Sequence, residues 1–236
     1  MVTTVNQTLH KSNFTVGGTV TQQTHFSGSV ALAKDDWVHH YDIGYLMLDH
    51  NGDTSASVNW QTGSLSDHTD GLSDDLLGES VFSLGINHRQ GFSNKTYGYV
   101  VVPGVSVSDM SNYAANPQIQ VLSNTTTVQA VHHDDLDITS ALFYQPGSLT
   151  MADGSILTSD KAVAVLVKKA GAYVMVSAAS PQYSSMTAKI TLEGELTGDN
   201  VSYNAYSDVS TITFSLASGN DKGRTVTHAL TNPHGS

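Results

Sequence analysis

The chain has 236 residues, no cysteine and a formal net charge of −11 at pH 7. This length is enough for one large or two small β domains with buried cores. Without cysteine the chain can form neither disulfides nor thiolate metal sites. Its negative charge argues against a surface for nucleic acid or for anionic membranes. Only 13% of the residues are charged, so Ser, Thr, Asn, Gln and Gly must supply much of the solubility, as in many secreted β proteins.

The chain shows no segment that would span a membrane or direct export. No run of about 18 apolar residues is present. The first residues, MVTTVNQTLHKSNF, lack the basic and then apolar regions of a signal peptide. We therefore expect a fragment of a longer protein that is secreted, extracellular or periplasmic, with its signal peptide outside this chain.

The first predicted strands lie before residue 61. An edge strand is predicted at Asn13–Val20, interrupted by Gly17-Gly18. The nearly continuous apolar run Ile43–Leu48 predicts a strand that is buried on both faces. Asn51-Gly52 predicts a hairpin turn, and the alternation of small and apolar residues over Ser55–Trp60 predicts the strand that follows it.

A long polar loop, Gly63–Gly78, comes next and carries four aspartates. Loops of this length are usually functional or mobile. Strict alternation from Phe82 to Ile86 then predicts a strand with one apolar face. After a turn at Arg89–Lys95, we expect the strand Thr96–Val102 to complete a hairpin with it.

The remaining strands are shorter, and turn signals separate them. Pro146-Gly147 marks the change, and no segment shows a helical period over three turns. This spacing predicts an all-β fold, an antiparallel β-sandwich at residues 1–145 followed by a smaller C-terminal β-sandwich at residues 146–236. The predicted strands after residue 118 are Ile119–Leu122, Thr125–Val131, Ala141–Tyr144, Ala162–Val167, Ala172–Ser177, Met186–Leu192, Val209–Leu216 and Arg224–Leu230.

Aromatic, histidine and amide residues are concentrated between Trp37 and Tyr99. Sugars offer apolar C–H faces to aromatic rings and hydroxyls to amides, and acidic sugars add carboxylates or sulfates that suit Arg and Lys. The same aromatic residues could instead fill a sandwich core, and we favour that interpretation for Trp37 and Tyr45. The candidate set is Trp37, His39, His40, Tyr41, Trp60, His88, Arg89, Asn94, Lys95, Tyr97 and Tyr99.

Three further clusters are weaker candidates. Asp49, Asn51 and Asp53 match the first half of a calcium loop, but Trp60 stands where its closing glutamate belongs, so a plain turn is favoured. The acidic loop 67–75 could hold a hard cation, but a solvated loop is the simpler interpretation. The adjacent pair His132-His133 points to opposite faces of a strand, so a surface turn is favoured over a metal site.

Four segments together resemble polysaccharide lyase family 8, the chondroitin, hyaluronan and xanthan lyases. They are WVHHYDIGYLML at 37–48, WQTGSLSD at 60–67, VFSLGINHRQGFSNKTYGYVVVPG at 81–104 and IQVLSNTTTVQAVHH at 119–133. The resemblance implies the super-sandwich-like β domain of that family followed by its small C-terminal β-sandwich.

The departures from the family bear on catalysis. Its lyases carry an N-terminal helical toroid that supplies catalytic residues, and no counterpart is visible here. The catalytic glutamate of the family's β domain lies upstream of the matching region, so no catalytic residue is carried over and we expect no activity from the chain alone. Leu65 stands where the family has an aromatic residue, and Arg89 adds a cation after Asn87-His88.

Two functions are weighed, and the missing motifs argue against a third, an unrelated enzyme. The first is a non-catalytic carbohydrate-binding module for acidic polysaccharide, a glycosaminoglycan such as chondroitin sulfate or hyaluronan, or alginate. The alternative is a structural domain that supports the catalytic toroid of a lyase and has no ligand of its own. The net charge argues against the first, because a polyanion is repelled unless cations cluster locally.

The expected sugar site joins two neighbouring strand regions. Trp60 and Tyr97 would stack on sugar rings, and Arg89 and Lys95 would meet carboxylate or sulfate. If the faces of Trp60 and Tyr97 are buried, the loops at 63–78 or 132–137 would replace this site. No cofactor is expected, and calcium is only weakly supported. Gln61 and Asn94 would form hydrogen bonds with the sugar hydroxyls, and His88 would be a further residue of this site.

Overall fold

The computed structural model describes residues 2–9, 13–21, 28–50, 53–67, 69–88, 96–182, 184–217 and 219–235. The chain divides into two compact units, 1–117 and 118–236. Both units consist almost entirely of antiparallel strands, which confirms the predicted fold class. The division falls 28 residues before the expected boundary at 145/146. The reason is that the strands between residues 119 and 143 pair with strands of the C-terminal unit.

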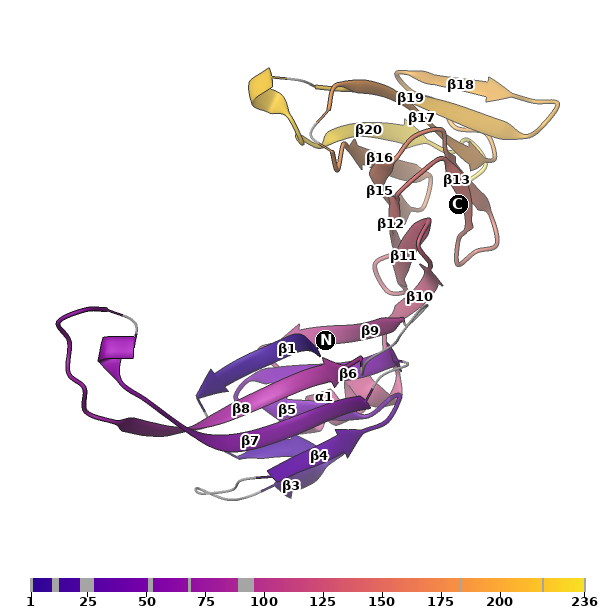
Figure 1. The fold of residues 1–236 in the computed structure, drawn as a ribbon. Coiled ribbons are helices and arrows are strands. Elements are labelled where there is room, and N and C mark those ends of the chain that lie inside the picture. Colours follow the sequence, from indigo (N-terminus) through magenta and orange to yellow (C-terminus); the bar gives the residue numbers. More distant parts are fainter. Residues whose placement is uncertain are drawn as a thin grey trace. The chain divides into compact units, whose positions relative to one another are not determined.

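The first unit is a sandwich of two antiparallel sheets (Figure 1). One sheet has the order β1-β8-β7-β4, and the other has the order β3-β2-β5-β6-β9. The strands are β1 (Val2–Leu9), β2 (Phe14–Val16), β3 (Thr19–Thr21), β4 (Gly28–Leu32), β5 (Trp37–His40), β6 (Ile43–His50), β7 (Asp53–Gly63), β8 (Leu77–Asn87) and β9 (Tyr97–Pro103). A 3-10 helix, Leu65–Asp67, lies between β7 and β8.

Strand β6 is buried on both faces, as its apolar run predicts. Tyr45 and Met47 pack into the core between the two sheets. Leu46 instead packs with Trp37 and Met110 in a second cluster beneath α1 (Val107–Ala115). Successive residues of β6 are apolar because the two faces of this strand pack into two different cores.

The helix α1 was not predicted. It begins after Ser106, whose Oγ accepts a hydrogen bond from the backbone N–H of Asp109 at 3.1 Å. At nine residues it is too short to show a helical period over three turns. Its stability comes from this cap and from the burial of Met110 against β5 and β6.

The alternation in β8 is confirmed, because Phe82, Leu84 and Ile86 are fully buried. The two predicted hairpins, with turns at Asn51-Gly52 and Arg89–Lys95, are wrong. β8 pairs with β7 and β1, whereas β9 pairs with β6, so these consecutive strands belong to opposite sheets. The same holds for β6 and β7. Crossing between sheets allows both partners to turn their apolar faces into a shared core.

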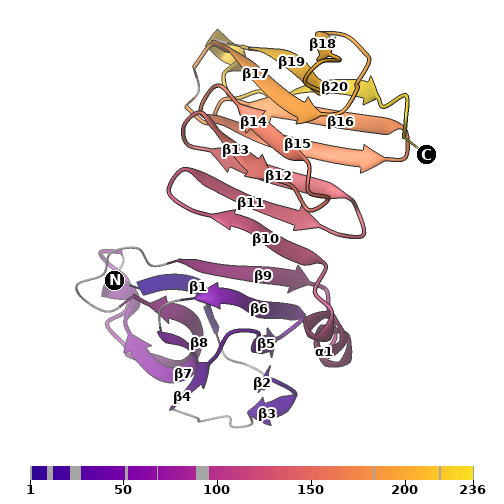
Figure 2. The ribbon, with the colours of Figure 1, turned by 90° about the vertical axis from the view of Figure 1, so that its right-hand side faces the viewer.

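The second unit is also a two-sheet sandwich (Figure 2). Its sheets have the orders β10-β11-β12-β15-β16-β20 and β13-β14-β17-β19-β18, and its core includes Phe143, Leu157, Ile190 and Phe214. The strands are β10 (Ile119–Asn124), β11 (Val128–His133), β12 (Ile138–Phe143), β13 (Gly147–Thr150), β14 (Ile156–Ser159), β15 (Val163–Ala170), β16 (Tyr173–Ala179), β17 (Met186–Glu193), β18 (Val201–Asn204), β19 (Val209–Leu216) and β20 (Val226–Thr231). A 3-10 helix, Gly219–Asp221, precedes β20.

Candidate functional site

One end of the first unit carries a row of aromatic and histidine side chains. Tyr97, the first residue of β9, is 40% exposed, and its ring lies 5.4 Å from that of His88 and 6.5 Å from that of Tyr99. The planes of the two tyrosine rings differ by only 7°. Nε2 of His88 lies 2.8 Å from Oγ1 of Thr3, a hydrogen bond that holds the buried imidazole in place. We call His88, Tyr97 and Tyr99 the aromatic row.

The inner part of this row is anchored in the core. Tyr99 packs against the buried cluster that contains Tyr45 and Met47. The hydroxyl of Tyr45 accepts a hydrogen bond from Nδ2 of Asn6 at 2.6 Å. Burial raises the pKa of Tyr45 above 10.0, with only partial opposition from the Asn6 hydrogen bond, so this tyrosine is a neutral structural group. Tyr97 is the ring of this row that is most open to a ligand.

Trp60 lies elsewhere, on the hairpin arm formed by residues 60–80, where the end of the β7–β8 hairpin extends beyond the other strands (Figure 1). Its indole is 53% exposed and lies over Gly78. Gln61, the next residue, is exposed and pairs across the hairpin with Glu79. Alternation along the strand places Trp60 and Gln61 on opposite faces, so the two side chains do not converge.

The expected site residues therefore form two separate groups. Next to His88, at one end of the β7–β8 hairpin, Asp53 pairs with Asn87. Trp60 lies seven residues further along β7 and pairs with Ser80. Seven residues along a strand span about 23 Å. A single sugar cannot contact both the aromatic row and Trp60.

Several predicted residues lie outside the described part of the chain. These are Arg89, Asn94 and Lys95 of the sugar site and Asn51 of the calcium alternative. In the sequence, Arg89 directly follows His88, and Lys95 stands two residues before Tyr97. Asp53 is exposed, and the described residues contain no group of three or more His, Asp or Glu side chains that could hold a metal.

Other members of the candidate set have structural roles. Trp37 is buried beneath α1, as expected for a core residue. His39 is buried, with Nε2 lying 2.8 Å from the backbone carbonyl oxygen of Val105. The ring of His40 stacks on Phe82 at 4.2 Å, and the hydroxyl of Tyr41 donates to the carbonyl of Leu9. These contacts join strands and loops of the sandwich.

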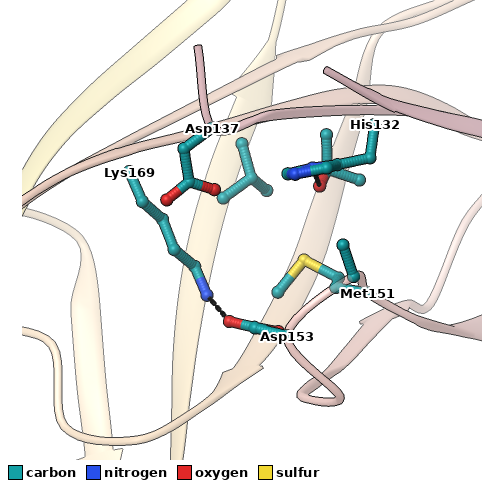
Figure 3. A pocket seen from close by; sticks show the side chains of 8 residues that line it. His132, Asp137, Met151, Asp153 and Lys169 are labelled. Carbon is teal, nitrogen blue, oxygen red and sulfur yellow. Dashed lines mark hydrogen bonds and ion pairs between the residues drawn. The ribbon is translucent and has the colours of Figure 1, made fainter. Parts of the chain in front are cut away.

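The second unit contains a pocket that the sequence did not reveal. It has a volume of about 280 Å³ and lies where the β11–β12 turn, β15 and the β13–β14 turn meet (Figure 3). His132 points into the unit and His133 to the other face, as predicted for adjacent strand residues. The lining residues are His132, Asp137, Thr139, Met151, Ala152, Asp153, Val167 and Lys169.

An ion pair closes one side of this pocket. The ammonium group of Lys169 donates to Oδ2 of Asp153, and Oδ1 of Asp153 accepts from the backbone N–H and the hydroxyl of Ser155 at 3.0 and 2.6 Å. Burial by itself would raise the pKa of Asp153. The hydrogen bonds from Lys169 and Ser155 and the positive charge outweigh it and lower that pKa to about 2. Asp153 therefore stays ionised near neutral pH.

Sequence signals for this pocket were weak because its residues are scattered. The sequence predicts His132–Asp137 as a surface turn and as an alternative location for the sugar site, but it gives no signal for Asp153 and Lys169, which stand 16 residues apart. Only the packing of two sheets brings them together.

Among the described residues, no helix is long and apolar enough to cross a membrane.

Comparisons with known proteins match both units. The model of the polysaccharide lyase family 8 super-sandwich domain matches residues 1–114, and that of the family's C-terminal β-sandwich domain matches residues 120–189. Chondroitinase-AC of Pedobacter heparinus is 33% identical over 162 residues, which are 69% of this chain and 23% of that protein. Hyaluronate lyase HylB of Enterococcus faecalis is 28% identical over 142 residues, or 58% of this chain and 14% of that one.

Solved structures of lyases also match this chain. A chondroitinase AC lyase matches with a TM-score of 0.80 and 26% identity over 96% of this chain and 32% of that one. A Paenibacillus xanthan lyase, at 20% identity over 99% of this chain and 24% of its own, shares the fold with a TM-score of 0.79. The chain thus spans only about a quarter to a third of these proteins. It belongs to polysaccharide lyase family 8, with the super-sandwich match lying in its first unit and the C-terminal β-sandwich match in its second.

Proposed function

We propose that this chain is a non-catalytic part of a lyase for acidic polysaccharide and that it contacts the polysaccharide at the aromatic row. The observation that carries this proposal is the partly exposed Tyr97 ring, held parallel to Tyr99 and beside His88. In the sequence, the segment between His88 and Tyr97 contains Arg89 and Lys95. Aromatic rings and cations close to each other in the sequence suit a sugar chain that alternates apolar ring faces with carboxylates or sulfates.

The substrate class comes from the relatives. They are named chondroitinase, hyaluronate lyase and xanthan lyase. Polymers of this kind are found outside the cytoplasm, so we infer a secreted or periplasmic location and a catalytic lyase domain as partner. The single α-helix among the described residues has nine residues. The described residues thus contain no helical toroid, which supports the proposal that catalysis belongs to another part of the lyase.

Binding by the aromatic row can be measured by calorimetry at low salt against chondroitin sulfate, hyaluronan, alginate and a neutral glucan. We expect weak binding of the acidic polymers that falls as salt rises, because screening weakens the contribution of Arg89 and Lys95. Tyr97→Ala should lower the affinity up to about tenfold, since a well-placed aromatic contact contributes about 0.5–1.5 kcal/mol beyond the area that it buries. Arg89→Ala with Lys95→Ala should remove the salt dependence.

Tyr206→Ala is the matched control, because Tyr206 is fully exposed in a turn of the second unit. It should bind like the unchanged chain. If no acidic polymer binds, or if both tyrosine variants lose affinity equally, the aromatic row is not the site. The absence of an ultraviolet signal from unsaturated uronate products would agree with the proposed lack of catalysis, and its appearance would contradict it.

A second candidate function is support of another protein domain through the hairpin arm. Four leucines on the arm, Leu65, Leu72, Leu76 and Leu77, are between 48% and 75% exposed. Residues 60–80 contain five carboxylates and neither Lys nor Arg. Exposed apolar groups within a charged rim are typical of protein contacts, and the carboxylates favour a basic protein surface over a polyanion.

This candidate can be tested by sedimentation velocity. The chain would be mixed with the part of the Pedobacter heparinus chondroitinase-AC that lies outside the matching region. Co-sedimentation that is lost in the double variant Leu76→Ser, Leu77→Ser would support docking through the arm. Equal sedimentation of the unchanged chain and this variant would leave the arm without such a role.

A further inference from the structure

The pocket of the second unit has the features of a built binding site. Its volume of about 280 Å³ lies just below the usual range for small-molecule sites, about 300–1,000 Å³. Its walls come from both sheets of one sandwich, so its shape does not depend on how the two units are placed. Neither the aromatic row nor the hairpin arm contributes to it.

Two large apolar side chains line the pocket, Met151 from the β13–β14 turn and Val167 from β15. Met151 and Val167 are almost completely buried, and both line the cavity. Figure 3 shows the sulfur of Met151 pointing into the space between the labelled polar groups. Such side chains suit the C–H groups of a sugar ring and cannot hold a small ion by themselves.

Other lining residues are polar and locally ordered, and two of them, His132 and Thr139, lie on the same sheet as Val167. Nδ1 of His132 lies 3.0 Å from the hydroxyl oxygen of Thr139, so the ring is held in one orientation, and both residues are buried. Asp137 has a positive φ of 46°. The backbone N–H of Asp137 donates to the carbonyl of Asp134 at 3.2 Å, and the carbonyl of Asp137 accepts from the backbone N–H of Lys169 at 3.0 Å. The His132 ring and the backbone of Asp137 are therefore held in place before a ligand binds, which lowers the cost of ordering them on binding.

The charges in the pocket select among ligands. Asp137 and Asp153 are acidic, and Lys169, the ammonium group that lines the pocket, is already paired with Asp153. A ligand carboxylate or sulfate would meet two carboxylates and would have to displace Asp153 from Lys169. Hydroxyls, in contrast, can donate to carboxylates and accept from the ammonium, hydroxyl and imidazole groups. The described residues contain no metal-binding group that would reverse this preference.

We propose that this pocket binds one uncharged sugar ring, with its C–H groups against Met151 and Val167 and its hydroxyls on Asp137, His132 and Lys169. The volume admits a ring of monosaccharide size. The site is independent of the proposed polysaccharide contact in the first unit and differs from it in preferring neutral over acidic sugars.

The proposal is tested on the whole 236-residue chain by NMR titration with free glucose, N-acetylglucosamine and glucuronate. The readout is the set of ring ¹⁵N and ¹H shifts of His132. A dissociation constant on the order of 1 mM is expected for a neutral ligand this small. Glucuronate should bind at least about fivefold more weakly than the better neutral sugar, because of the carboxylates in the pocket.

Asp137→Asn removes the acceptor charge with little change in backbone preference, since asparagine also tolerates positive φ. It should weaken binding of the neutral sugar about tenfold, the effect of one hydrogen bond to a charged group. Asp208→Asn is the matched control, because Asp208 also has a positive φ, 53°, and does not line the pocket. It should bind like the unchanged chain.

Three results would overturn the proposal: no shift of the His132 ring with either neutral sugar, tighter binding of glucuronate, or equal effects of the two Asp→Asn variants. The Tyr97→Ala variant separates this site from the proposed polysaccharide contact. It should leave the monosaccharide titration unchanged, and Asp137→Asn should leave chondroitin sulfate binding unchanged.

Discussion

The side chain of Met110 packs directly on the backbone of Gly44, so that α1 and β6 approach without a side chain between them. A Cβ built on Gly44 would lie 2.9 Å from Cγ of Met110, still closer to its sulfur, and 3.1 Å from Cγ1 of Val105. Met110 is fully buried. The glycine is therefore required by space, and α1 is held against β6 by this contact.

Gly44→Ala should consequently destabilise the first unit by about 1–3 kcal/mol, as overpacking of a core usually does. Met110→Ala alone should cost about 2–5 kcal/mol through the cavity that it leaves. The double variant should cost clearly less than the sum, because each change makes room for the other. Urea denaturation measures all three. Gly85→Ala is the control, since its Cβ would meet only ordinary contacts of 3.4 Å or more.

The two units should unfold separately, because each has its own buried core. Phe82→Ala in the first core and Phe214→Ala in the second should each cost about 3–5 kcal/mol. Calorimetry should show two transitions, with each variant lowering only one of them. A single transition that both variants lower equally would mean that the units unfold as one.

Stability in acid should depend on the Lys169–Asp153 pair. The pKa of Asp153 is lowered from 3.8 to about 2 in the folded chain, so the carboxylate stabilises the fold above about pH 4. This stabilisation is lost as the pH falls from about 4 to about 2. Lys169→Met should cost about 1 kcal/mol or less at pH 7, since the two side chains are 30% and 48% exposed.

The difference between the unchanged chain and Lys169→Met should be constant from about pH 7 to 5 and should shrink below about pH 4. Urea denaturation at several pH values measures it. Lys168→Met serves as the control, because Lys168 is the neighbouring lysine and does not line the pocket. A Lys169→Met deficit that persists unchanged to about pH 2 would show that the pair does not cause the lowered pKa.

Trp60 and Trp37 should be distinguishable by fluorescence, since they are the two tryptophans of the chain and are 53% and 6% exposed. Trp60→Phe should shift the emission to shorter wavelengths and should remove most of the quenching by acrylamide. Trp37→Phe should do the opposite and should also lower stability, because Trp37 is a core residue.

The same tryptophan tests how far the polysaccharide contact extends. Trp60→Ala should change chondroitin sulfate affinity less than about twofold, because the hairpin arm is acidic and repels a polyanion. Tyr97→Ala is the positive comparison in the same calorimetric experiment. An equal loss in both variants would extend the proposed site along the hairpin to Trp60 and Gln61.

Local patterns in the sequence were sufficient for much of the fold. The alternation from Phe82 to Ile86 predicted which side chains of β8 are buried, and the apolar run at 43–48 predicted a strand buried on both faces. Both are confirmed because side-chain direction along a strand is a local property with a period of two. The four ordered motifs were likewise sufficient for the family.

Strand pairing and the sites depended on contacts that are distant in the sequence. The turn signals at 51–52 and 89–95 predicted hairpins, but their strands lie in opposite sheets. The sequence predicts one site for Trp60 and Tyr97, whereas the register separates their groups by about 23 Å. The pocket joins the segment 132–139 to Asp153 and Lys169, and no local pattern links these residues in the sequence. Sequence by itself determined the lineage and the faces of the strands, because those are local patterns. Only the tertiary structure decided which faces meet, because the pairing and packing of sheets join distant residues.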